Sequence, residues 1–173
     1  MELKTKRLNI RYIEESDWKR LMEIWQDFNQ SEYAKYDGPH TEDEAEVQQK
    51  VKRFSEATPY GEHLFFAVCL EAKMIGIVDF HKTPDGYDLG YCFHRNYHGN
   101  GYAKESLEAL IEWLSKGHKT VFTAGTALNN IPSVKLLTAL GFRKTGEEQV
   151  SFYQDESGKD IYFTGGIFSL DVN

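Results

Sequence analysis

Two glycines, Gly99 and Gly101, stand between an apolar, strand-like segment and an amphipathic helical segment. A helix N-terminus leaves about four backbone N–H groups without intrahelical partners and carries roughly half a positive charge. Glycines at this entrance let a phosphate approach those groups closely, because no side chain stands in the way. The segment therefore predicts an anion site, and the expected ligand carries a pyrophosphate. The alternative interpretation is an ordinary strand, turn and helix with a flexible loop.

The spacing of the glycines does not match two common phosphate loops. A dinucleotide-binding loop requires a third glycine three positions after Gly101, where Lys104 stands. A P-loop requires a Gly-Lys-Ser/Thr tripeptide, which the chain lacks. The ligand therefore has to be inferred from other parts of the sequence.

The composition predicts one globular domain that spans residues 1–173, with 40% hydrophobic and 27% charged residues. The longest apolar run, Leu64–Leu70, is far shorter than the ~20 residues that a membrane span needs. The N-terminus lacks the apolar segment of a signal peptide, so we expect a cytoplasmic location and reduced Cys69 and Cys92. The net charge of −7 argues against nonspecific nucleic-acid binding and suits a cationic acceptor.

The hydrophobic pattern predicts strands and helices on both sides of the glycine loop. We expect Ser16 to cap the first helix, and Thr41 with Glu44 to form a capping box for a second helix that ends near Glu56. Residues 29–40 show no periodicity and are interpreted as a loop. Two later helices are expected at Ala103–Lys116 and Pro132–Leu140. Strands are expected at Leu8–Tyr12, Leu64–Glu71, Met74–Thr83, Tyr87–His94, Thr120–Ala127, Lys144–Gln154 and Lys159–Leu170.

The order of these elements predicts an α/β (α+β) fold. Three consecutive strands before the loop form an antiparallel meander, and the strand, helix and strand around the loop form a parallel pair with a right-handed crossover. The expected sheet is mixed and mostly antiparallel, with about seven strands and helices on both faces. Where the parallel pair splays apart, exposed backbone groups can pair with an extended ligand. The cofactor site is expected there.

Three blocks resemble the GNAT acyltransferases. The loop His98–Ala103 resembles the family's acetyl-CoA-binding motif, Gln/Arg-x-x-Gly-x-Gly/Ala, although the Gln or Arg is not reproduced. Leu128–Phe142 is similar to the Asn-x-x-Ser-x-x-Leu-Leu-x-x-Leu-Gly-Phe signature of the ribosomal-protein N-acetyltransferase (RimJ/RimL-like) branch, and Thr5–Asp17 is similar to that branch's opening. The resemblance covers nearly the whole chain and implies a GNAT-like fold.

The resemblance also implies site residues. Main-chain contacts to the pantetheine arm would come from Tyr91, Cys92 and Phe93, whose side chains have core packing as the alternative role. The pyrophosphate would be held by Gly99, Asn100, Gly101, Tyr102, Ala103 and Lys104.

For catalysis the resemblance implies that Asn130 bonds the cofactor's amide or an ordered water, and that Ser133 faces the sulfur as a proton donor. Helix capping is the alternative role for both residues. Many relatives have a tyrosine four positions after the Ser133 site, where this chain has Leu137. This departure shifts the proton source to Ser133 or to a water.

Attack by an amine also requires removal of a proton. A lysine-type amine costs roughly 4 kcal/mol to deprotonate near neutral pH, whereas an α-amine costs about 1 kcal/mol or less. Three side chains on the central strands, Asp79, His81 and Asp88, are candidate bases, and Asp88 joins Ser133 and Asn130 in the predicted catalytic set.

The resemblance thus implies an N-acetyltransferase that uses acetyl-CoA as cosubstrate and transfers the acetyl group directly, without a metal or a covalent enzyme intermediate. The acceptor is left open: the branch resemblance favours a protein or peptide N-terminal amine, whereas related sequences acetylate polyamines, aminoglycosides or other small amines. It is expected near residues 29–40. Neither nucleic acid nor a membrane is an expected partner, and a homodimer is left open. One alternative is a non-catalytic acyl-CoA-binding regulatory module. Another is a nucleotide-binding protein that would bind ATP or NAD rather than CoA.

Overall fold

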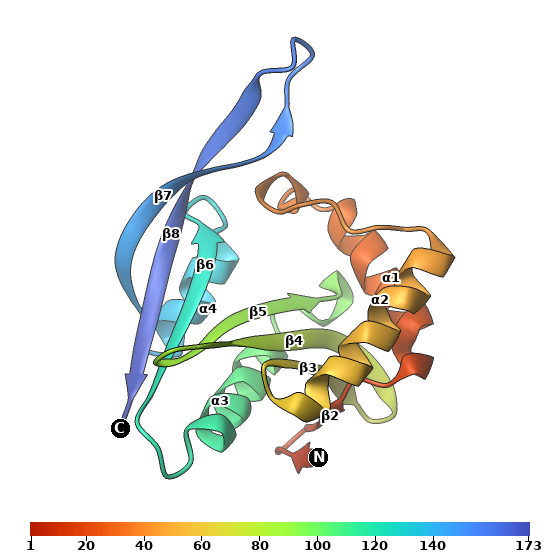
Figure 1. Ribbon diagram of the computed structural model, residues 1–173, viewed down its shortest axis with the longest axis vertical. Helices are drawn as coiled ribbons and strands as arrows, with labels where there is room; N and C mark the ends of the chain where they lie inside the picture. Colours follow the sequence, from red (N-terminus) through yellow and green to blue (C-terminus); the bar gives the residue numbers. More distant parts are fainter.

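A computed structural model describes residues 1–173 and arranges them around one eight-stranded sheet (Figure 1). The strand order is β1-β2-β3-β4-β5-β6-β8-β7, and every neighbouring pair is antiparallel except β5 and β6. The strands are β1 (Glu2–Lys4), β2 (Leu8–Tyr12), β3 (His63–Leu70), β4 (Lys73–Thr83), β5 (Gly86–Phe93), β6 (Thr120–Ala127), β7 (Arg143–Gln154) and β8 (Asp160–Val172).

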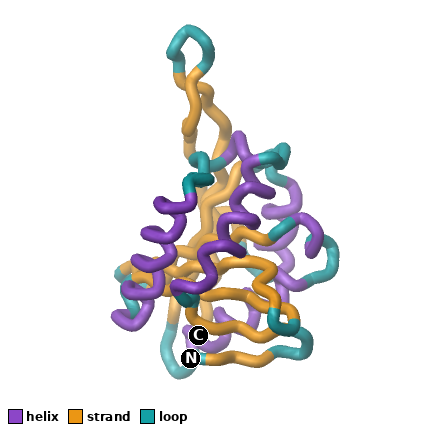
Figure 2. The backbone as a smooth tube through the Cα atoms, turned by 90° about the vertical axis from the view of Figure 1, so that its right-hand side faces the viewer, coloured by secondary structure: helices purple, strands orange, loops and turns teal.

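Helices cover both faces of the sheet (Figure 2). One face carries α1 (Trp18–Asn29) and α2 (Glu44–Ala57), and the other carries α3 (Tyr102–Ser115) and α4 (Ile131–Ala139). The short 3-10 helices are η1 (Glu15–Asp17), η2 (Ala34–Tyr36), η3 (Thr58–Tyr60) and η4 (Arg95–Tyr97). The far end of the β7–β8 hairpin projects beyond the rest of the molecule in both views. No helix combines the length and the apolar composition that crossing a membrane requires.

The core has two parts because β3 is buried on both faces. Leu64, Phe66 and Val68 pack with residues of α3 and α4, whereas the alternate residues Phe65 and Ala67 pack with those of α1 and α2. Successive side chains of a strand point to opposite faces, so a strand covered on both sides reads as an unbroken apolar run. This explains why residues 64–70 show no polar alternation.

The parallel pair is short, and its two strands then diverge. Only Gly86–Asp88 of β5 pairs with β6, in register with Val121–Thr123. A Cβ atom at Gly86 would lie 2.0 Å from the carbonyl oxygen of Val121, so glycine is required for this close approach. The rest of β5 has no strand partner on its β6 side. The predicted splayed pair is therefore confirmed.

The elements differ from the prediction mainly at their ends. The sheet has eight strands rather than about seven, because the three-residue β1 pairs with β2. Ser16 does not cap α1 but lies inside η1, where Glu14 N donates to Asp17 Oδ2 (2.8 Å). The expected Thr41 capping box is also wrong, since α2 is capped by Asp43. Its Oδ1 accepts a hydrogen bond from Glu46 N at 2.9 Å.

Candidate active site

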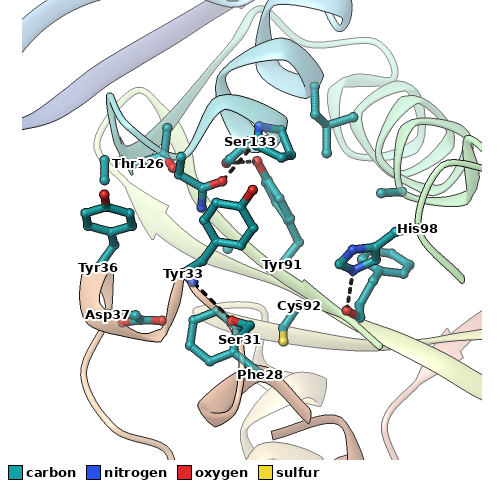
Figure 3. Close-up of a pocket in the computed structure, with 18 of the residues that line it drawn as sticks. Phe28, Ser31, Tyr33, Tyr36, Asp37, Tyr91, Cys92, His98, Thr126 and Ser133 are labelled. Carbon is teal, nitrogen blue, oxygen red and sulfur yellow. Dashed lines mark hydrogen bonds between the residues drawn. The ribbon is translucent and has the colours of Figure 1, made fainter. Parts of the chain in front are cut away.

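A cavity of about 580 Å³ opens where β5 and β6 diverge (Figure 3). Its walls come from the end of α1, the segment 31–37, the second half of β5, the loop before α3, the first turn of α4 and the β7–β8 hairpin. The predicted site residues in these walls are Tyr91, Cys92, Phe93, Gly99, Gly101, Tyr102, Ala103, Lys104, Asn130 and Ser133. The structure thus brings both sequence blocks, residues 98–103 and 128–142, to one cavity.

The glycine loop presents free backbone amides to the cavity. Gly99 and Gly101 have left-handed φ angles of 74° and 78°, which glycine adopts without steric cost. Gly101 caps α3 without a side-chain bond, and the first main-chain bond of the helix runs from Glu105 N to Gly101 O (3.0 Å). The amides of residues 102–104 consequently have no partner within the chain. The space beside Gly99 is open, since no atom lies within 4 Å of the place where a Cβ atom would stand. A pyrophosphate therefore has room to reach the free amides.

The N-terminal segment braces this loop. Arg7 Nη1 donates to the carbonyl oxygen of Asn100 (2.8 Å), and Arg7 Nε donates to Glu105 Oε2 (2.7 Å). Thr5 Oγ1 donates to the same carboxylate at 2.6 Å. Partial desolvation acts to raise the pKa of Glu105, but the hydrogen bonds from Thr5 and Arg7 outweigh it and lower that pKa. The Arg7 guanidinium also lies 4.5 Å from the centre of the Tyr102 ring.

Asn100 is a predicted cofactor residue whose side chain is engaged elsewhere. Its Nδ2 donates to the carbonyl oxygens of His98 (3.0 Å) and Tyr97 (3.4 Å), and the residue does not line the cavity. These bonds hold the turn in shape. The structure therefore gives Asn100 a supporting position behind the free amides.

The alternation of main-chain groups along β5 decides which of its residues face the unpaired edge. On the β4 side, His94 N donates to Ile75 O (3.1 Å), and on the β6 side Val121 N donates to Asp85 O (3.0 Å). Main-chain groups of successive residues point to opposite sides of a strand. Odd-numbered residues of β5 consequently direct their N–H and C=O groups toward β6, and even-numbered residues direct them toward β4.

This alternation sorts the three residues that were expected to contact pantetheine. Tyr91 and Phe93 face the open edge, although the Phe93 carbonyl already lies 2.7 Å from His98 Nε2. Cys92 is an even-numbered residue that pairs with Ile77, so its main-chain groups point toward β4 and the structure does not present them at the open edge. Its side chain lines the cavity instead, and burial raises the pKa of its thiol to about 12.

Two hydroxyl groups meet at the first turn of α4. Tyr91 Oη lies 2.6 Å from Ser133 Oγ, and Asn130 Oδ1 caps the helix by accepting from Ser133 N (3.3 Å). Burial raises the pKa of Tyr91 to about 12, partly opposed by the bond with Ser133. Leu137 is fully buried in the core. The hydroxyl partner of Ser133 is thus Tyr91 on β5, which the sequence assigned only to main-chain contact or core packing.

The predicted bases lie outside the cavity. Asp88 accepts a hydrogen bond from Thr123 Oγ1 (2.7 Å) in the paired part of β5 and β6, and it is not among the residues that line the cavity. Asp79 lies 3.1 Å from His81 Nε2, and this contact raises the pKa of His81. Neither residue lines the cavity. The structure therefore does not bring Asp88 together with Ser133 and Asn130.

Three other carboxylates do line the cavity: Asp27 at the end of α1, Asp37 after η2, and Glu148 on β7. Asp27 accepts from Arg95 N (2.8 Å) and forms an ion pair with the Arg95 guanidinium. No sequence motif connects these carboxylates, because they come from segments far apart in the chain. Only Asp37 lies in a segment that the sequence singled out, since the acceptor is expected near residues 29–40.

Comparison with known proteins identifies the family to which this chain belongs. The model of the Acetyltransferase (GNAT) domain matches residues 7–143. The uncharacterized N-acetyltransferase YnaD of Bacillus subtilis (strain 168) is 31% identical over 151 residues, which cover 84% of this chain and 85% of YnaD. The chain therefore belongs to the GNAT acetyltransferase family and is an enzyme of the acetyltransferase class.

Solved structures share the fold. RimL, a ribosomal alpha-N-protein acetyltransferase in complex with coenzyme A, has a TM-score of 0.82 at 15% identity and covers 99% of this chain and 98% of its own. The ribosomal-protein-S5-alanine acetyltransferase from Vibrio fischeri has a TM-score of 0.81 at 20% identity, with coverage of 98% and 96%. At these identities the likeness establishes the GNAT fold.

Proposed function

We propose that this enzyme transfers the acetyl group of acetyl-CoA directly to a primary amine, either a protein N-terminal amine, a polyamine or another small amine. The observation that carries the proposal is the meeting of free amides, an unpaired strand edge and a hydroxyl pair in one cavity. Two proteins of the same fold are known with the expected ligand: RimL in complex with coenzyme A, and the self-immunity acetyltransferase MccE with acetyl-CoA and AMP.

The cofactor would lie along the diverging strands. The amides of residues 102–104 would hold the pyrophosphate, and the open edge of β5 at Tyr91 would pair with the pantetheine arm. This path leads from the glycine loop to the first turn of α4, since all three segments line the same cavity. The thioester end would then reach Ser133.

Acetyl-CoA supplies an activated acetyl group and releases its thiol when an amine takes that group. The enzyme's part is to hold a proton where the sulfur leaves. With its pKa raised to about 12, Tyr91 keeps its proton at neutral pH, and Ser133 is its only side-chain partner. Either hydroxyl can donate at this distance, and the arrangement we propose for catalysis has Tyr91 donating to Ser133 Oγ, which leaves the proton of Ser133 free to point into the cavity. We assign Ser133 as the proton donor and Tyr91 as the residue that orients it.

The amine must lose a proton before it attacks. Asp37 replaces Asp88 as the proposed acceptor of that proton, directly or through a water, because Asp37 lines the cavity and Asp88 does not. For an α-amine the required free energy is about 1 kcal/mol or less near neutral pH, so a weak base suffices.

Direct transfer also agrees with the state of the two thiols. Burial raises the pKa of Cys92 to about 12 and also raises that of Cys69. A thiol attacks as its thiolate, and a raised pKa lowers the fraction of thiolate at neutral pH. Neither cysteine is therefore proposed as an acyl carrier.

A panel of amines tests the proposal. Purified protein is given acetyl-CoA and each amine, and the products are scored by release of free CoA thiol and by mass spectrometry for the gain of one acetyl group. Calorimetric binding of CoA, ATP and NAD is measured on the same preparation. Tight CoA binding without any acetylated amine would favour a non-catalytic acyl-CoA-binding module. Binding of ATP or NAD instead of CoA would overturn the assignment of the glycine loop.

A further inference from the structure

The end of the cavity that lies away from the glycine loop is walled by aromatic rings. Five of them form what we call the aromatic chamber: Phe28, Tyr33, Tyr36, Phe152 and Phe163. None belongs to the cofactor-binding blocks. In Figure 3 the Tyr33 ring extends from the segment 31–37 toward the Tyr91–Ser133 pair. The chamber therefore borders the place where the acetyl group would be transferred.

Two parts of the chain meet to form the chamber wall. The Tyr36 and Phe163 rings pack edge to face with centroids 5.3 Å apart, and Tyr153 Oη donates to the carbonyl oxygen of Ala34 (3.2 Å). Phe152 stacks on Phe163 at 6.0 Å, yet it is still 46% exposed. Aromatic faces that remain open inside a cavity gain contact area when a flat apolar group fills the space.

The charge of the chamber favours a cation. Asp37, which follows η2, and Glu148 on β7 both line the cavity, and neither forms an ion pair with lysine or arginine. The nearest base to Asp37 is His40, at 3.8 Å, and burial lowers the pKa of His40, so this side chain is neutral near pH 7. Arg95, which lines the cavity, is bound to Asp27, and Lys35 lies outside the cavity lining with its Nζ 5.0 Å from the centre of the Tyr36 ring. Carboxylates and aromatic faces together attract an ammonium group.

We propose that the acceptor is a primary arylalkylamine, whose ring enters the aromatic chamber while its ammonium group lies near Asp37. This inference rests on the proposed function. A polyamine carries charge along its whole length and would need carboxylates along the chamber, where rings predominate. A polypeptide would place polar main-chain groups against ring faces, which cannot satisfy them.

The chemistry of the step is balanced. The C–N bond forms and the C–S bond of acetyl-CoA breaks. Of the two protons that the ammonium group loses, one passes to solvent through Asp37. The other replaces, at Ser133, the proton that Ser133 gives to the sulfur, so the products are the acetylated amine, the free CoA thiol and one proton.

The experiment compares amines at saturating acetyl-CoA and measures their binding to the CoA complex by calorimetry. We expect 2-phenylethylamine to have a kcat/KM at least about tenfold above those of spermidine and a short peptide with a free N-terminus, and to exceed 2-cyclohexylethylamine by about threefold. The anion 3-phenylpropanoate should not bind. A preference for spermidine or for the peptide would overturn the inference while leaving the proposed function intact. Loss of CoA binding altogether would instead refute the proposed function.

Variants make the test specific to the chamber. Phe152→Leu and Asp37→Asn should each weaken binding of 2-phenylethylamine to the CoA complex by about three- to tenfold, with unchanged CoA affinity. The matched controls are Tyr60→Leu, an 83% exposed ring outside the cavity, and Asp171→Asn, an exposed carboxylate outside it. Unaltered amine binding in both chamber variants would show that the acceptor lies elsewhere.

Discussion

The contact between Tyr91 and Ser133 allows the proposed proton donor to be tested by a double-mutant cycle. If Ser133 delivers a proton to the leaving sulfur, Ser133→Ala should lower kcat about 100-fold, the usual scale for a proton-transfer group. Tyr91→Phe removes only the bond that orients Ser133, and we expect a fall of about tenfold. Because Tyr91 acts through Ser133, the double variant should be no slower than Ser133→Ala. Independent roles would instead give a fall of about 1,000-fold.

Stability provides a second measurement in the same cycle. The Tyr91 hydroxyl is largely buried, and its oxygen forms a hydrogen bond with Ser133 Oγ at 2.6 Å. Ser133→Ala leaves it unpaired, which should cost about 1–3 kcal/mol in the free energy of unfolding. Tyr91→Phe removes the hydroxyl itself and should cost only about 1 kcal/mol. Adding Tyr91→Phe to Ser133→Ala should therefore recover part of the loss.

The assay measures kcat, KM, CoA affinity and denaturant unfolding on each protein. Tyr162→Phe and Ser55→Ala are matched controls, because Tyr162 is exposed, Ser55 is half-buried and neither residue lines the cavity. Near-normal turnover of Ser133→Ala would remove Ser133 from catalysis and leave a bound water as the proton source. A double variant about tenfold slower than Ser133→Ala would show that Tyr91 acts on its own.

Three further changes test other parts of the site. Gly101→Val should weaken CoA binding at least tenfold in calorimetry, because it puts a branched side chain beside the free amides and strains a φ angle of 78°; unchanged affinity in folded protein would contradict the loop assignment. Cys92→Ser and Cys69→Ser should each retain most of the activity, and an acetyl-cysteine adduct that passes its acetyl group to an amine would contradict direct transfer. Alkaline unfolding should reveal Tyr91 and Cys92, whose pKa values are raised from 10.0 and 9.0 to about 12. The unfolded state loses these protons first, so stability should fall between about pH 9 and pH 12, and less in Tyr91→Phe.

The cofactor half of the site could be predicted because its determinants are local in sequence. Gly99 and Gly101 set the turn, the following residues form the helix, and the unpaired amides result from helix geometry alone. Helix caps were predicted less well. Thr41 and Asp43 are both good capping residues two positions apart, and only the packed structure shows that Asp43 bonds the helix.

The hydroxyl and carboxylate partners could not be predicted, since they depend on contacts between distant segments. Tyr91 and Ser133 are 42 residues apart, and nothing in either local pattern shows that β5 and α4 bring their hydroxyls together. Asp88 was a reasonable candidate because it lies on a central strand. Its position in the short paired part of β5, rather than in the splayed part, depends on where β5 and β6 separate.

The two halves of the cavity therefore have different origins, and this has a consequence for the acceptor. Apart from Asn130 at the start of α4, the residues that would bind CoA lie on β5, on α3 and in the loop between them, within residues 91–104. The chamber is assembled from the end of α1, the segment 31–37 and the β7–β8 hairpin, which meet through contacts such as Tyr36 with Phe163. Substitutions in these segments can change the rings and charges of the chamber without disturbing the free amides. Acceptor choice can thus vary among relatives that share the glycine loop, so the aromatic chamber is the part of this enzyme from which its own substrate should be inferred.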